Sequence, residues 1–422
     1  MASGSAGAPT SVPRGDDWGC GCGPNCFTLD GDSFTCRRVL DEPEVWRVEL
    51  LMHDTFLPSV NAFVVLDGGD ALVVDAGTPD EFNDTRLMRA LVGLGVDPAR
   101  TTLFCTHAHI DHTGLARELS EAGASVLVPE GVLADMRRFA VPAWRDGMVA
   151  RMRAEGAGDA EAAELADVIW DHVLNFESEG IGFSVVAAGD AVRCGRWSFE
   201  VVPAPGHTVG QCVLWEPARR VAFLGDAVLF LCSTCIGFWD EGEDPIGAQL
   251  ATLDRLAALG VEHAFMGHGL QEGPLDERCR ANAAHHERRS ARALAAIREA
   301  PGRTGFELVS AMGWRAPFDR WSETPALTRW FLVSESIAHL DHLVATGAAL
   351  CERDGEGVSR YYPSEAYAAR RACKGGVQRG QALSHGMAPC ESACPPRTPS
   401  TNTCCTIRGG GCRLRTKETP LV

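Results

Sequence analysis

Short apolar runs separated by turn residues dominate the first part of the chain. Residues 46–50, 61–69 and 71–77 are rich in Val and are divided by Gly and Asp, a pattern that predicts a meander of β-strands. The apolar spacing then predicts a helix, a buried strand, a second helix and a second strand, over 80–95, 101–107, 112–123 and 124–130.

The pattern changes over about residues 131–176. Two long helical patterns occupy this stretch, and Pro142 is expected to interrupt the first, because proline lacks the backbone N–H of a helix interior. Four further strands, a helix over 244–260 and a last strand over 261–269 follow. Two halves that each mix strands with helices predict an α+β domain over 41–280, with sheets packed face to face, helices outside and a helical insertion.

The chain is almost entirely helical after residue 270. Helical patterns cover 275–300 and 324–349, and two β-type flanks surround the turn sequence "DGEG" within 350–362, which indicates a hairpin. Helices followed by a hairpin predict a small winged-helix domain over 281–366. We expect three tryptophans, Trp314, Trp321 and Trp330, to belong to the core of that domain.

The two ends of the chain differ from the rest in composition. Residues 1–40 form a Cys/Gly-rich extension whose sequence "CGCGPNC" could hold zinc or form a disulfide cluster, although no second CxxC or His pair stands nearby. Residues 367–422 are basic, Cys-rich and rich in Pro, Gly, Ser and Thr without a hydrophobic period, so we expect this tail to be disordered.

Charge and cysteine placement narrow the class of protein. A net charge of −17 argues against a general nucleic-acid binder, which needs a basic surface. The start "MASGSAGAPTSVPRG" has no apolar core of a secretory signal, and no run approaches the ~20 apolar residues of a membrane span. Cysteines within apolar runs act as small hydrophobic residues. We therefore expect a cytoplasmic protein with reduced thiols and no membrane association.

Metal-type side chains recur where predicted strands end. The stretch "FCTHAHIDHTG" holds His107, His109, Asp111 and His112 in the spacing H-x-H-x-D-H, directly after a buried strand. Three later strands end in turns that present the remaining members of the set, His207, Asp226 and His268. Imidazole nitrogens and carboxylate oxygens are good zinc ligands. Seven of them exceed the needs of one tetrahedral ion and suffice for two.

These motifs, in this order, resemble the metallo-β-lactamase superfamily. The resemblance rests on "VVDAG" with Asp75, "THAHIDH", "GHT", "GD" and "GH", and it covers roughly residues 44–272. It implies an αββα sandwich. The later "HHERR", the helix over 329–347 and the hairpin resemble the winged-helix extension of the β-lactamase-like subgroup, which includes an endoribonuclease and thioesterase-like hydrolases.

The resemblance also implies roles for individual residues. His107, His109 and His207 would hold a first metal, Asp111, His112 and His268 a second, and Asp226 would bridge the two. Asp75 would orient a ligand histidine by a hydrogen bond. The implied cofactors are two divalent ions, zinc first, with iron or manganese as alternatives. A metal-bound hydroxide would be the nucleophile, with Asp111, His112 and Asp226 as the catalytic residues.

Candidates for the substrate pocket are Phe238, Trp239, His285 and His286. The first two follow "LCSTC", which has the spacing of a redox motif but lacks its strand-to-helix setting, and the histidine pair lies on a predicted helix. The helical insertion is expected to cover the site and to form an apolar pocket.

Three functions fit the motifs. The first is hydrolysis of an acyl thioester or related small ester, as in glyoxalase II or thioesterase-like relatives. The second is a metallo-endoribonuclease, but residues 288–365 hold ten Arg against ten Asp or Glu, which gives little attraction to phosphate. The third is a redox di-iron protein, which resembles H-x-E-x-D-H and has Glu where this chain has His109. We favour the hydrolase, with a small-molecule substrate and no specific nucleic acid. We expect the C-terminal domain to serve either in packing within the chain or in formation of a homodimer.

Overall fold

The computed structural model describes residues 26–27, 36–52, 57–174, 176, 178–239, 242–314, 316 and 318–364. Most of the predicted Cys/Gly-rich extension and all of the predicted disordered tail, 367–422, lie outside the described residues. Residues 36–40, which the sequence analysis assigned to that extension, form strand β2, which pairs with β3.

The larger sheet has eight strands in sequential order, β1 to β8. Neighbours are antiparallel from β1 to β5 and parallel from β5 to β8. The strands are β1 (Cys26–Phe27), β2 (Cys36–Leu40), β3 (Glu44–Leu51), β4 (Ser59–Asp67), β5 (Asp70–Val74), β6 (Thr101–Phe104), β7 (Ser125–Pro129) and β8 (Phe183–Val186). Strands β5, β6 and β7 are buried along most of their length, as parallel strands covered on both faces are, whereas the edge strand β8 is partly exposed.

The second sheet has five strands in the order β13-β12-β11-β10-β9. Its strands are β9 (Ala191–Cys194), β10 (Trp197–Pro203), β11 (Cys212–Glu216), β12 (Val221–Gly225) and β13 (His263–Met266). Phe63 and Phe104 of the first sheet share one buried cluster with Phe199 and Phe223 of the second, and the ring centroids of Phe63 and Phe223 are 5.6 Å apart. The predicted face-to-face packing of two sheets is therefore confirmed.

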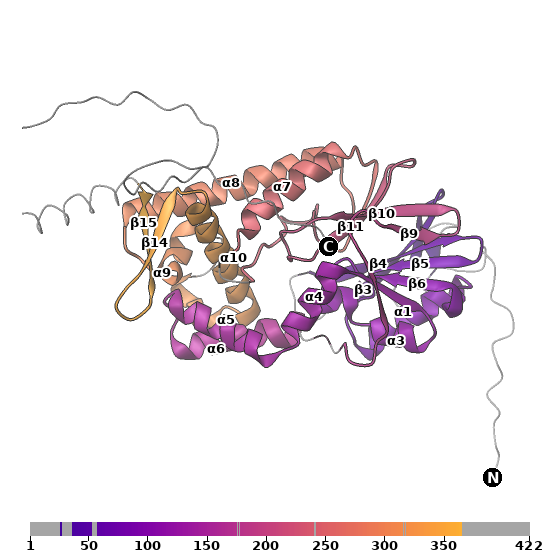
Figure 1. Ribbon diagram of the computed structural model, residues 1–422, viewed down its shortest axis with the longest axis horizontal. Coiled ribbons are helices and arrows are strands. Elements are labelled where there is room, and N and C mark those ends of the chain that lie inside the picture. Colours follow the sequence, from indigo (N-terminus) through magenta and orange to yellow (C-terminus); the bar gives the residue numbers. More distant parts are fainter. Residues whose placement is uncertain are drawn as a thin grey trace, which may run out of the picture. The chain divides into compact units, whose positions relative to one another are not determined.

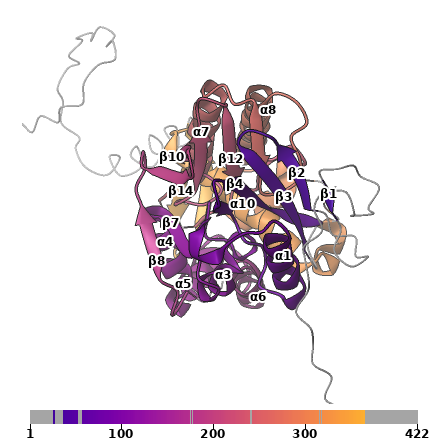
Figure 2. The same ribbon diagram turned by 90° about the vertical axis from the view of Figure 1, so that its right-hand side faces the viewer.

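Helices cover the outer face of each sheet (Figure 2). The first sheet buries its outer face against α1 (Glu81–Gly93), α3 (Ala116–Glu121) and the insertion, through residues such as Leu87, Leu119 and Leu133. The second sheet is covered by α7 (Pro245–Ala258) and by the start of α8 (Leu275–Glu299), through Leu253 and Leu275. A short 3₁₀ turn, η1 (Pro98–Arg100), precedes β6.

The insertion between β7 and β8 contains three helices where the sequence pattern predicted two. They are α4 (Glu130–Phe139), α5 (Pro142–Ala154) and α6 (Asp159–Ile169), followed by a π-helical turn, η2 (Trp170–Leu174). Pro142 starts α5 at the first helical turn, where its missing N–H has no partner to lose, so the predicted interruption is confirmed.

The C-terminal part contains α8, α9 (Gly305–Val309), η3 (Ser310–Met312), η4 (Phe318–Glu323), α10 (Ala326–Ala345) and a hairpin of β14 (Ala349–Arg353) and β15 (Ser359–Pro363). The predicted long helices and hairpin are confirmed, whereas their classification as a winged helix stays a prediction. Among the described helices, none combines the length and the apolar character needed to cross a lipid bilayer.

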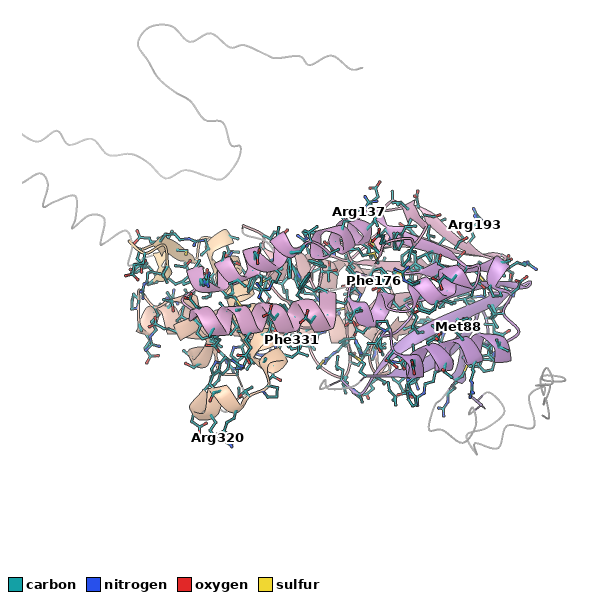
Figure 3. The ribbon with its side chains drawn as sticks, turned by 90° about the horizontal axis from the view of Figure 1, so that it is seen from below. Met88, Arg137, Phe176, Arg193, Arg320 and Phe331 are labelled. Atoms are coloured by element: carbon teal, nitrogen blue, oxygen red, sulfur yellow. The ribbon has the colours of Figure 1, made fainter. Side chains whose placement is uncertain are left out.

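The C-terminal helices pack against the insertion within one compact unit (Figure 1). Arg151 of α5 pairs with Asp341 of α10 at 2.7 Å, and the Tyr361 hydroxyl donates to Glu155 at 2.9 Å. Arg329 of α10 adds ion pairs to two glutamates of α6. Side chains of both parts belong to one hydrophobic cluster, and Phe331 of α10, which packs against this cluster, is labelled in Figure 3. The insertion and α10 therefore act as one wall beside the sheets.

Candidate metal centre

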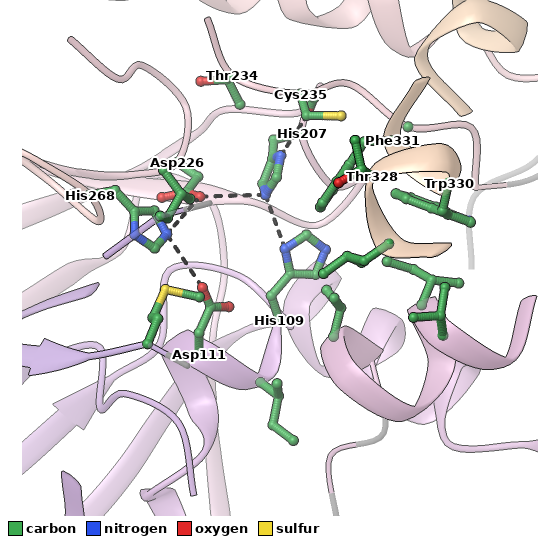
Figure 4. Close-up of a pocket in the computed structure, with 18 of the residues that line it drawn as sticks. His109, Asp111, His207, Asp226, Thr234, Cys235, His268, Thr328, Trp330 and Phe331 are labelled. Carbon is green, nitrogen blue, oxygen red and sulfur yellow. Dashed lines mark hydrogen bonds and ion pairs between the residues drawn. The ribbon is translucent and has the colours of Figure 1, made fainter. Parts of the chain in front are cut away.

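All seven predicted ligand residues lie together at one edge of the sandwich. His107 and His109 follow β6, and Asp111 and His112 lie on the single helical turn α2 (Ile110–Thr113). The other members come directly after strands or strand turns of the second sheet: His207 after β10, Asp226 after β12 and His268 after β13. Figure 4 shows five of the seven converging on one space. Strand ends thus bring residues from four segments to one point.

Three imidazole nitrogens form the first group. His109 Nδ1 is 3.2 Å from His107 Nε2 and 3.0 Å from His207 Nε2. All three side chains are buried. Ligands at about 2.0–2.1 Å from a tetrahedral ion lie about 3.3 Å from one another. The three nitrogens are thus spaced as ligands of one ion.

Carboxylates and two further imidazoles form the second group. His268 Nε2 is 3.3 Å from Asp111 Oδ2 and 3.4 Å from Asp226 Oδ2. His112 Nε2 lies 3.6 Å from Asp226 Oδ1 and 3.7 Å from Asp111 Oδ2. Asp226 Oδ2 is also 3.7 Å from His207 Nε2 in the first group. Asp226 therefore faces both groups, as a bridging carboxylate would.

Unpartnered buried atoms support a metal-binding role. His112 Nε2 and Asp226 Oδ1 are buried and have no hydrogen-bond partner among the described residues, although they face each other. Buried polar atoms are almost always satisfied by a protein group, a water or an ion. Carboxylate and imidazole atoms aimed at one another in this way fit divalent cations.

Four of the five histidines are held in place through Nδ1, the ring nitrogen that points away from the cluster. His112 Nδ1 contacts Asp75 Oδ2 at 2.8 Å, His207 Nδ1 contacts the Cys235 carbonyl at 2.8 Å, and His268 Nδ1 contacts the Ser59 carbonyl at 2.8 Å. His107 Nδ1 lies 3.1 Å from the Thr106 hydroxyl. Such contacts set the tautomer and aim the inner nitrogen at the metal position.

Asp75 lies where the sequence analysis expected an orienting carboxylate. It also accepts hydrogen bonds from the backbone N–H and the hydroxyl of Thr106, at 2.8 and 2.9 Å. Its backbone has φ of 61°, an uncommon left-handed conformation for a residue other than glycine. Strain of this kind is retained when the surroundings demand it, and here three contacts hold the carboxylate in place.

Two motif glycines are required by close approach. A Cβ at Gly267 would lie 2.3 Å from Asp226 Oδ1 and 2.5 Å from a His112 ring carbon. A Cβ at Gly225 would lie 2.4 Å from the Thr106 hydroxyl. The glycines of "GD" and "GH" are therefore required because a side chain at either position would collide with a ligand or with Thr106.

Burial and neighbouring charge divide the cluster into two electrostatic halves. Burial, together with neighbouring histidines, lowers the pKa of His107, His109 and His207, which leaves these rings neutral. Burial alone would raise the pKa of Asp226, but His268 and His112 hold it well below its usual value. Burial alone would lower the pKa of His112, but the carboxylates of Asp111, Asp75 and Asp226 outweigh burial and raise this pKa to about 9. Metal binding here would therefore release protons from the second half.

An apolar cavity of about 740 Å³ opens onto this centre. His109, Asp111, His207, Asp226 and His268 form its polar floor. Its walls come from the end of α6 and η2, from α10 and from the loop after β12, including Ile169, Val173, Leu229, Trp239, Trp330 and Phe331. The insertion and the C-terminal helices thus cover the centre together.

Trp239 is the predicted pocket residue that lines the cavity. Its indole N–H donates to the His207 carbonyl at 2.9 Å, and its ring lies 5.6 Å from His109 and 5.8 Å from Trp330 between centroids. The structure places Phe238 outside the cavity lining, buried, with its backbone N–H bonded to Ser334. His285 and His286 of α8 are also outside the lining, and His286 lies behind it, 3.9 Å from the lining residue Glu335.

Sequence reasoning missed other parts of the site. Trp330 was expected in the core of a separate C-terminal domain, which is wrong: it packs against Trp239 and lines the cavity. The carbonyls of Ser59 and Cys235, which hold two of the ligand histidines, carry no side-chain signal in a sequence. Cys105, which follows the apolar run of β6, is fully buried, as expected for a cysteine that acts as a small hydrophobic residue.

Comparison with known proteins identifies the fold family. The model of the metallo-beta-lactamase superfamily matches residues 56–268. A protein of unknown function from Aquifex aeolicus is 28% identical over 191 residues, which are 43% of this chain and 70% of that protein. A hydroxyacylglutathione hydrolase from Bdellovibrio bacteriovorus is 42% identical over 43 residues, which are 10% of this chain and 17% of that protein.

Solved structures show the same fold over a longer stretch. A metallo-beta-lactamase family protein from Thermus thermophilus superposes with a TM-score of 0.62 and 24% identity, covering 76% of this chain and 98% of that one. A beta-lactamase domain protein from Burkholderia ambifaria gives a TM-score of 0.64 and 24% identity, covering 78% and 94%. Since the family model spans half of the sequence and its motifs form the centre described above, the chain belongs to the metallo-beta-lactamase superfamily.

Proposed function

We propose that the protein is a dinuclear-metal-dependent hydrolase of an acyl thioester or a related small ester. The observation that carries this proposal is the apolar cavity that opens onto the cluster of histidines and carboxylates. A reactive polar floor below apolar walls suits a substrate that joins a hydrolysable carbonyl to an apolar chain.

The donor atoms favour two divalent ions, zinc first. His107, His109 and His207 would hold one, Asp111, His112 and His268 the other, and Asp226 would contact both. Neutral imidazoles and ionised carboxylates suit zinc, while iron and manganese accept the same ligands. When bound, such ions supply an activated water as nucleophile and stabilise negative charge on the substrate oxygen.

The protein's own residues bind the substrate and exclude water. Trp239 lies beside His109 and packs against Trp330, and both tryptophans are buried, so an acyl chain beside them would displace water from the reacting carbonyl. Trp239 also holds the His207 carbonyl, which couples the cavity wall to the first group of ligands. Asp75 keeps His112 aimed at the centre.

The cavity favours an uncharged acyl group over a phosphodiester. Among the described residues that line it there is no Lys or Arg, whereas Asp80, Asp171 and Glu335 contribute carboxylates. Phosphate recognition depends on cationic side chains, so this lining argues against the endoribonuclease alternative. The name of the short-matching relative from B. bacteriovorus denotes hydrolysis of an acylated glutathione, which agrees with the ester class.

A substrate screen on metal-loaded protein tests the proposal. Acyl thioesters and esters of increasing chain length, lactones, a phosphodiester and a short RNA would be compared at equal protein concentration. We expect turnover of thioesters or esters, lost on chelation and restored by zinc. The matched control is a variant of an exposed histidine of β13, His263→Ala, which should retain full turnover. Preferential cleavage of the phosphodiester or RNA, or turnover that survives complete metal removal, would overturn the proposal.

A further inference from the structure

The structure contains a second cluster of metal-type side chains. It shares no residue with the seven ligands at the strand ends around Asp226, which are called the strand-end centre from here on. His286 of α8 and Glu335 and His339 of α10 are buried, with exposed fractions of 0%, 7% and 0%. One ligand atom from each lies within 4.8 Å of the others. Glu335 and His339 are four residues apart on one helix, so both side chains project from the same face of α10.

The nitrogens in this cluster lack partners. Neither ring nitrogen of His286 has a hydrogen-bond partner among the described residues, and the same is true of His339 Nε2. His286 Nδ1 and His339 Nε2 lie 3.9 and 3.8 Å from the same oxygen, Glu335 Oε1. These distances are too long for hydrogen bonds and only somewhat longer than the spacing of ligands around one ion.

The second nitrogen of His339 is held as in many metal sites. His339 Nδ1 lies 2.8 Å from the buried Ser290 hydroxyl, which turns Nε2 toward Glu335. The nearby guanidinium of Arg289 donates to the Met312 carbonyl at 2.7 Å and lies 3.6 Å from the centre of the Trp314 ring. Burial keeps the pKa of His286 at about 4 and that of His339 at about 3, so both rings are neutral with a lone pair to donate.

We propose that His286, Glu335 and His339 form a further transition-metal site, distinct from the strand-end centre. Two imidazoles and one carboxylate are a known ligand set for zinc and for ferrous iron, with the remaining positions open to water or another ligand. The inference does not depend on the substrate proposed above, because it follows from a separate set of buried donors.

An ion at this position would have a structural role. It would join α8 to α10, the helix that forms one wall of the cavity. Glu335 reaches that cavity and interacts with the Cys235 thiol, whose residue carbonyl in turn holds His207. The ion would therefore fix the cavity wall and the loop after β12 against each other.

Metal content measured by elemental analysis tests the site. The full-length protein would be purified without chelator and loaded with zinc or, anaerobically, with ferrous iron. His286→Asn, Glu335→Gln and His339→Asn should each carry one ion fewer than the wild type. The control is His285→Asn, since His285 is the adjacent, partly exposed histidine outside the cluster and should keep the wild-type content. Differences are compared rather than totals, because the chain has 17 cysteines that can also bind metal.

A second measurement separates this site from the strand-end centre. Anomalous diffraction at the metal edge should show a peak between His286 and His339, and this peak should persist in His107→Ala. Glu335→Gln changes the shape of the side chain very little. The inference would be overturned if this variant held as much metal as the wild type, or if a water molecule occupied the expected metal position. Either outcome leaves the proposed hydrolase intact. The inference of a separate site would also be contradicted if His107→Ala lost all its metal and showed no residual peak between His286 and His339.

Discussion

The metal-binding edge and the helical wall of the cavity are built in different ways. The edge consists of strand ends and one helical turn within residues 107–268, inside the stretch that matches the family. The wall is made of α6, η2 and α10, and α10 lies beyond that stretch. Ligands on short rigid strand ends have little freedom, whereas helices can change their side chains without moving the strands. The edge should therefore control whether the reaction occurs, and the wall should control which substrate is accepted.

The largest effect is expected from the ligands of the edge. Asp111→Ala or His112→Ala should lower kcat on the order of 10³-fold or more, because each removes a ligand whose charge or lone pair no neighbour replaces. The hydrophobic core lies elsewhere, so circular dichroism should stay unchanged. Turnover near the wild-type rate in either variant, at equal metal content, would show that the second group of ligands is not catalytic.

Asp75→Asn should have a smaller effect on the same edge. The amide keeps the size and tolerates the left-handed backbone, but it replaces a carboxylate that accepts from His112 and Thr106. Metal affinity should fall by about 10–100-fold. A zinc titration against a competing chelator measures this change, and excess zinc should restore most of the activity. An affinity equal to that of the wild type would mean that the His112 ring is positioned by packing alone.

Trp330→Ala tests the wall through stability. The side chain is buried against Trp239 and Phe331, so its removal leaves a cavity and should cost about 3–5 kcal/mol of unfolding free energy. Urea denaturation gives the value, and Trp330→Phe should lose less. A cost below about 1 kcal/mol would indicate that α10 contributes little to the wall.

Phe331→Ala tests the wall through specificity. This partly exposed residue lines the cavity, and its loss should lower kcat/KM for long acyl chains about 10-fold while short chains are unaffected. Metal content should match the wild type. An equal loss for every chain length would place Phe331 with the catalytic edge and would remove the distinction between edge and wall.

The smallest effect is expected for residues 371–422. Deleting this segment should change activity and melting temperature very little, because its sequence has no apolar period. The remaining protein should not bind RNA or DNA oligonucleotides with submicromolar Kd at about 150 mM salt, since the C-terminal helices balance arginine with carboxylates. Tight binding would return the endoribonuclease to first place, and a large fall in melting temperature would give the segment a structural role.

The sequence alone predicted most strands of the sandwich, although not β2 or β9, and the seven side chains that the structure brings together at one edge. This was achievable because each ligand follows its own strand, and strand ends along one edge converge whatever the rest of the chain does. The local signals of Pro142 and of the "DGEG" turn were equally reliable, since they act over a few residues.

The surroundings of the ligands depend on how distant segments of the chain pack together. The adjacent residues Phe238 and Trp239 look equivalent in sequence, yet Trp239 lines the cavity, whereas Phe238 contacts Arg151 of α5 and Ser334 of α10. His286 was expected near the substrate and instead meets Glu335 and His339 of α10. These outcomes depend on how helices far apart in sequence pack against one another, and no local pattern encodes the rotation of one helix relative to another.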